Sequence, residues 1–66
     1  MENIKYVKEK IVSEITGLAL STLRNARFKR MGIPYSKIGR SVRYNYNDVI
    51  NFMAKHKIET DQKKTI

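Results

Sequence analysis

The chain has 66 residues, a formal net charge of +8 and no cysteine. A chain this short makes one domain that buries only about 60% of its unfolded surface, so its core is thin and leaves little room for a small-molecule pocket. The lack of cysteine excludes disulfides, thiolate catalysis and cysteine-ligated zinc, and we expect neither a metal nor a cofactor. No apolar run exceeds three residues, so we expect a soluble cytoplasmic protein without a membrane span.

Positive charge is concentrated in one window of the sequence. No acidic residue lies between Ile15 and Asn47. The cations of this window are Arg24, Arg27, Lys29, Arg30, Lys37, Arg40 and Arg43. Such separation of charge is typical of a phosphate-binding surface, whereas a chain that only needs solubility mixes both signs. A solvated basic face without a partner is the alternative interpretation.

The first half of the chain predicts two short helices. Apolar residues with helical spacing predict the buried face of the first helix. They are Val7, Ile11, Ile15 and Leu18. Gly17 permits the left-handed backbone that ends a helix. The second helix is predicted over 19–30, with Ala19, Leu23, Ala26 and Arg30 on one side and Ser21, Arg24, Asn25, Phe28 and Lys29 on the other. Two helices around a turn that contains glycine form a helix-turn-helix candidate.

Beyond Gly32 and Pro34, the pattern predicts a β-hairpin. The side chains expected to share its buried face are Ile38, Val42, Tyr44 and Tyr46, with Lys37, Arg43 and Asn45 pointing outward. Gly39 can supply the positive φ that a tight turn needs, in a loop of two or three residues.

A third helix is predicted to follow the hairpin directly and to end near Lys57. Asn47 is its expected N-cap. Its buried stripe would be Val49, Phe52 and Met53, and His56 would be a packed or half-exposed side chain at its edge. Residues 59–66 show no periodicity and are predicted to form a disordered basic tail.

This order of elements is the plan of a small winged helix-turn-helix, and short motifs make the resemblance specific. The chain carries "ALSTL" in the second helix, then Pro34, "KIGR", "VRY" and "DV" ahead of the last helix. From Tyr6 to Met53 it resembles the MerR-type helix-turn-helix of phage excisionases and related small prophage regulators. We therefore expect a mainly α winged helix-turn-helix domain with a small β-hairpin wing over residues 1–58.

The resemblance implies a surface that binds double-stranded DNA. In this family the second helix enters the major groove, where Arg and Asn side chains can address guanine and adenine edges. The wing lies against the backbone or the minor groove, and Gly39 would leave Arg40 and Ser41 free at its tip. The candidate DNA-binding residues are Ser21, Thr22, Arg24, Asn25, Arg27, Lys29, Lys37, Arg40, Ser41 and Arg43.

Two functions compete at this point. The first is a DNA-binding accessory or regulatory protein of a mobile genetic element, either an excisionase-like architectural factor or a small transcriptional regulator. It would act with a recombinase, a replication enzyme or a second copy of itself. The alternative is an adaptor that docks such an enzyme through Leu20 and Phe28 and has only nonspecific nucleic-acid affinity, supplied by its basic charge. Independently of both functions, tyrosines beside basic residues could stack on single-stranded bases. No catalytic triad or paired carboxylates can be assembled, so we expect a non-enzyme.

Overall fold

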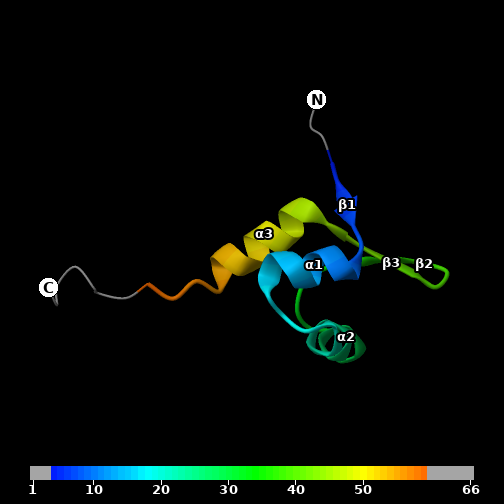
Figure 1. Ribbon diagram of the computed structural model, residues 1–66, viewed down its shortest axis with the longest axis horizontal. Coiled ribbons are helices and arrows are strands. Elements are labelled where there is room, and N and C mark those ends of the chain that lie inside the picture. Colours follow the sequence, from blue (N-terminus) through cyan, green and yellow to red (C-terminus); the bar gives the residue numbers. More distant parts are fainter. Residues whose placement is uncertain (1–3, 60–66) are drawn as a thin grey trace, which may run out of the picture.

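The computed structural model describes residues 4–59, and within them the chain forms three helices and a three-stranded antiparallel sheet (Figure 1). The elements in chain order are β1 (Tyr6–Val7), α1 (Glu9–Thr16), α2 (Leu20–Phe28), β2 (Ser36–Ile38), β3 (Ser41–Asn45) and α3 (Tyr46–Lys55). The chain is therefore a small mixed α/β domain. The predicted tail over 59–66 lies outside the described residues, except for Glu59.

The sheet has β3 at its centre, between β1 and β2. β1 pairs with the end of β3, where Val7 lies opposite Tyr44. The prediction that Val7 begins the first helix is wrong. Its spacing from Ile11 fits a helix, but its backbone is held in a strand and its side chain is buried against the core. Tyr46 extends this link, because its backbone N–H donates to the carbonyl of Lys5 at 2.8 Å.

The buried face of α1 differs from the predicted one. Val12 is fully buried, whereas Ile11 and Ile15 are 39% and 37% exposed. The helix begins at Glu9, after β1, and it packs against α2, β3 and α3 with the face that carries Val12. The end of α1 is as predicted: Gly17 adopts φ 77° and its N–H donates to the carbonyl of Ser13.

Helix α2 is shorter than predicted. Leu23 is buried as expected, but Arg30 lies beyond the end of the helix, where it is exposed and has a φ of 58°. Leu20 was expected to be available for protein docking, on or near the outward face, yet it is half-buried and packs against the core. Phe28 does point outward, with 87% of its surface exposed.

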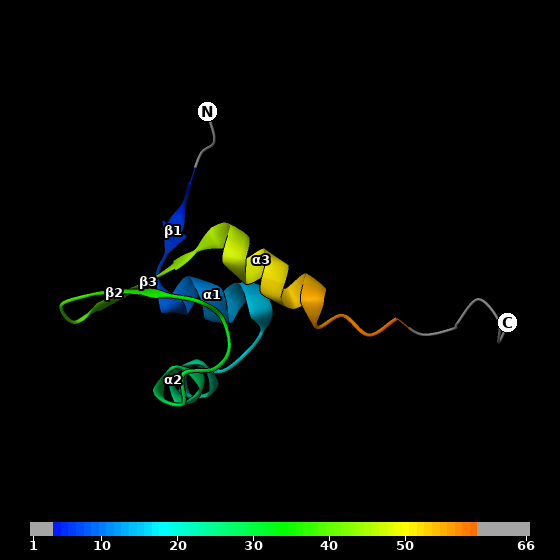
Figure 2. The ribbon, with the colours of Figure 1, turned by 180° about the vertical axis from the view of Figure 1, so that it is seen from behind.

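The hairpin of β2 and β3 turns through two residues, Gly39 and Arg40, because Ile38 pairs with Ser41. Gly39 has the predicted positive φ, at 61°. The predicted buried face is wrong for Ile38, which is 72% exposed. The hairpin projects past the helices (Figure 2), so no second layer covers its tip.

Helix α3 begins earlier than predicted. Its N-cap is Asn45, whose side-chain oxygen accepts a hydrogen bond from the backbone N–H of Asn47 at 2.8 Å, so the prediction of Asn47 as the cap is wrong. Tyr46 thus opens a helix instead of continuing a strand, and it is 39% exposed rather than buried. Val49 is fully buried, but Met53 is 40% exposed and lies outside the buried stripe.

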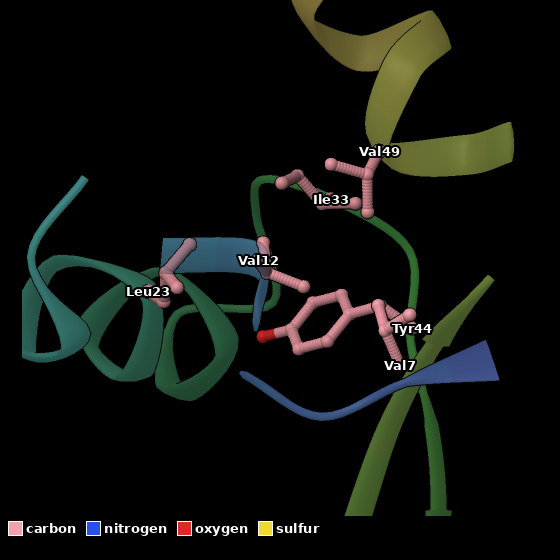
Figure 3. Close-up of a cluster of buried hydrophobic side chains, with 6 residues drawn as sticks. All are labelled: Val7, Val12, Leu23, Ile33, Tyr44 and Val49. Carbon is pink, nitrogen blue, oxygen red and sulfur yellow. The ribbon is translucent and has the colours of Figure 1, made fainter. Parts of the chain in front are cut away.

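The core joins every part of the fold. Its buried side chains are Val7, Val12, Leu23, Ile33, Tyr44 and Val49. Figure 3 shows the ring of Tyr44 reaching from β3 across this cluster toward α2. Ile33, in the connection between α2 and β2, was not predicted as a core residue. His56 was expected to be packed or half-exposed, but it is exposed at the end of α3, where its ring centre lies 4.1 Å from that of Phe52.

Candidate nucleic-acid interface

The outward side of α2 carries a ridge of three exposed residues. Ser21, Asn25 and Phe28 follow one another at spacings of four and three, which places them on one line along the helix. Leu23, the buried residue of this helix, lies on the opposite side. We call Ser21, Asn25 and Phe28 the α2 ridge.

A groove separates α2 from the hairpin. It has a volume of about 240 Å³ and is lined by Arg24, Arg27, Phe28, Tyr35, Lys37 and Val42. Lys37 of β2 therefore shares a surface with Phe28 of α2, although nine positions separate them in the sequence. The fold thus places side chains of helix α2 and of the hairpin around one groove.

Arg27 is held inside the protein rather than offered to a ligand. Its Nη1 donates to the hydroxyl of Tyr44 at 3.0 Å, its Nη2 lies 3.7 Å from Glu9 Oε1, and its side chain is only 17% exposed. The guanidinium also lies 5.7 Å from the centre of the Tyr35 ring. Burial by itself lowers the pKa of Arg27, but the hydrogen bond that Arg27 donates to Tyr44 and the negative charge of Glu9 outweigh it and raise the pKa. Arg27 thus remains charged and ties α2 to α1 and β3.

Arg24 is also paired within the protein, but it stays accessible. Its Nε donates to Glu9 Oε2 at 2.7 Å, and its side chain is 59% exposed. Glu9 precedes the acid-free window in the sequence, yet the packing of α1 on α2 places it beside two cations of that window. Sequence reasoning missed this role because the position of Glu9 in a helix does not reveal its partners on another helix.

The remaining predicted residues are mostly on the surface. Lys37, Arg40 and Ser41 are exposed along the hairpin, with Arg40 in the turn at its tip. Arg43 is half-buried, and its Nη1 donates to the carbonyl of Val42 at 2.9 Å.

A second flank of α2 faces the end of α3. Thr22, Asn25 and Lys29 line a hollow of about 390 Å³ there, together with Met31, Phe52 and other residues. The α2 ridge is therefore bordered on both sides by open surface, toward the hairpin on one side and toward α3 on the other.

The described part of the chain holds no cluster of three or more metal-ligating side chains. Among the same residues, no helix has the length and apolar character needed to cross a membrane. Comparison of the chain with models of protein families, with curated proteins and with solved structures finds no match in any of the three.

Proposed function

We propose that this chain is a winged helix-turn-helix protein that binds double-stranded DNA, with α2 in the major groove and the β2–β3 hairpin as the wing. The observation that carries the proposal is the shared surface of helix and hairpin: an exposed α2 ridge, a neighbouring groove, and cations on both elements. A helix about 10–12 Å across fits the major groove, and lysine and arginine side chains beside it can neutralise phosphates.

The two elements would have different tasks. Asn25 on the ridge has the amide that can form a bidentate pair with adenine. Arg24 and Lys29, exposed beside it on the helix, would contact phosphates. Arg40, at the tip of the hairpin, would contact phosphate or a narrow minor groove. Arg27 positions α2, since it is bonded to Tyr44 of β3. The proposal assigns no catalytic step.

The resemblance to excisionases suggests the biological setting. We propose an accessory or regulatory role in a mobile genetic element, as an architectural factor or a small transcriptional regulator. A single small domain buries limited surface on DNA, so binding beside a second copy, a recombinase or a replication enzyme would supply the missing affinity.

A salt titration tests the proposal. If about five phosphates are neutralised, the logarithm of the association constant for a short duplex falls with a slope near −4.5 against the logarithm of salt concentration. Arg40→Ala should reduce this slope by about one unit on every sequence, since the wing contacts the backbone or groove shape. Lys57→Ala, which removes the same charge after α3, is the matched control. Absence of duplex binding at about 50 mM salt would contradict the proposal.

The exposure of Phe28 supports a second candidate function, that of an adaptor for a recombination or replication enzyme. An 87% exposed aromatic side chain is suited to docking a protein. Leu20, the other residue of the expected patch, packs against the core, which reduces this patch to one side chain. The adaptor predicts that the purified protein shifts a duplex only in the presence of its partner enzyme.

A further inference from the structure

We infer that Phe28 recognises the 5-methyl group of a thymine in the major groove, so that the chain selects a site with neighbouring A·T pairs. This inference rests on the proposed function, because it requires α2 to lie in the groove. The ligand of the exposed phenyl ring would be the thymine methyl group, and the DNA site would contain neighbouring A·T pairs.

The α2 ridge presents no cation of its own. Arg24 reaches sideways to Glu9 on α1, and Arg27 reaches inward to Tyr44. The ridge is left with a hydroxyl, an amide and a phenyl ring, on Ser21, Asn25 and Phe28. Arginine is the side chain that commonly reads guanine, so a ridge without it is poorly suited to G·C pairs.

The two larger ridge residues match the edges of A·T pairs. The amide of Asn25 can donate to N7 and accept from N6 of adenine, and thymine is the base whose major-groove edge carries a methyl group. Three residues of helix span about 4.5 Å, close to the separation of about 3.4 Å between successive base pairs. Asn25 and Phe28 would therefore address neighbouring base pairs.

Charge around Phe28 favours DNA as its ligand. Arg24 and Lys37 line the same groove as the phenyl ring, and Lys29 follows it directly in the chain. A ring bordered by cations is complementary to a polyanion. The exposed Arg40 at the wing tip would independently favour sites rich in A·T pairs, because A-tracts have a narrow minor groove that attracts arginine.

Uracil substitution tests the inference. A preferred duplex is first selected from random sequences with the wild-type protein, and each of its thymines is then replaced in turn by deoxyuridine, which lacks only the methyl group. We expect one such substitution to weaken wild-type binding about fourfold, the contribution of one methyl group removed from water. Phe28→Ala should bind the thymine and uracil duplexes equally, whereas Ile58→Ala, which truncates another exposed apolar residue, should keep the fourfold difference.

The outcomes separate the inference from the function on which it rests. Failure of the wild-type protein to bind any duplex would overturn both. The thymine contact alone would be overturned if no uracil substitution weakened duplex binding, or if the same substitution weakened binding of Phe28→Ala as much as that of the wild type. Tighter binding to single strands than to duplex would also overturn it. The comparison of thymine and uracil duplexes on the wild-type protein needs no variant. It therefore still tests the thymine contact if a circular dichroism melt shows that Phe28→Ala is unstable.

Discussion

Glu9 is the residue through which α1 influences the basic surface. Its two carboxylate oxygens face Arg24 at 2.7 Å and Arg27 at 3.7 Å. It pairs with both arginines, and in the DNA-bound arrangement that we propose it would also place a negative charge near the phosphates. A glutamate at this point is expected to limit nonspecific binding while it orients α2, because like charges repel at short range.

Replacement of Glu9 by Gln should therefore strengthen binding to random duplex DNA by roughly threefold to tenfold, since one repulsive charge is lost and Arg24 is released. The change in melting temperature should stay within a few degrees, because the Arg24 side chain is 59% exposed and Arg27 keeps its hydrogen bond to Tyr44. Fluorescence titration against random duplex measures the affinity. Glu14→Gln, an equal charge change at an exposed position of α1, is the control. Equal gains in both variants would show that only net charge matters.

At the scale of elements, the connection between α2 and β2 sets the position of the hairpin relative to α2. Gly32 has a φ of 85°, and a Cβ at this position would lie 3.0 Å from the Cβ of Ala26. The chain thus passes close to α2 before Ile33 enters the core. Gly17 offers a comparison, since it has a φ of 77° but open space around it.

We expect Gly32→Ala to be more destabilising than Gly17→Ala. Both substitutions strain a left-handed residue by about 1 kcal/mol, but only the first also forces α2 and the connection apart. An additional cost of about 1 kcal/mol would lower the melting temperature by a further 4–8 °C in a domain of this size. Thermal melts of the two variants measure the difference. Equal melting temperatures would mean that the close approach to Ala26 relaxes without cost.

At the scale of the whole molecule, stability depends on very few side chains. Among the described residues, the buried core consists of one side chain from each helix, two from the sheet and Ile33 from the connection after α2. A domain of this length has a free energy of unfolding of only about 3–10 kcal/mol. Loss of one core side chain therefore removes a large fraction of it.

Val12→Ala should lower the melting temperature by about 10 °C or more, because it deletes two fully buried methyl groups and leaves a cavity. Ile11→Ala removes more atoms from the neighbouring position, but from a side chain that is 39% exposed, and should cost less than half as much. Circular dichroism melts compare the two. A larger loss for Ile11→Ala would mean that the face first predicted for α1 is the buried one.

Much of the local structure could be predicted from the sequence because its causes act over a few residues. Gly17 and Gly39 adopt positive φ, which their lack of a Cβ allows. The spacing of apolar residues predicted which three segments of the chain form helices, although not their exact ends. The outward position of Phe28 follows from the phase of α2 relative to Leu23. The basic character of the α2 and hairpin region is likewise a property of the sequence order alone.

Only the tertiary structure decided which side chains are buried and paired. Val12 is in the core instead of Ile11 because α1 packs with that face against α2, β3 and α3. Arg27 is bound to Tyr44, and Glu9 reaches Arg24, because α1, α2 and β3 meet at one point. Burial and ion pairing depend on how elements far apart in the chain are oriented, and local rules of propensity and periodicity contain no information about that orientation.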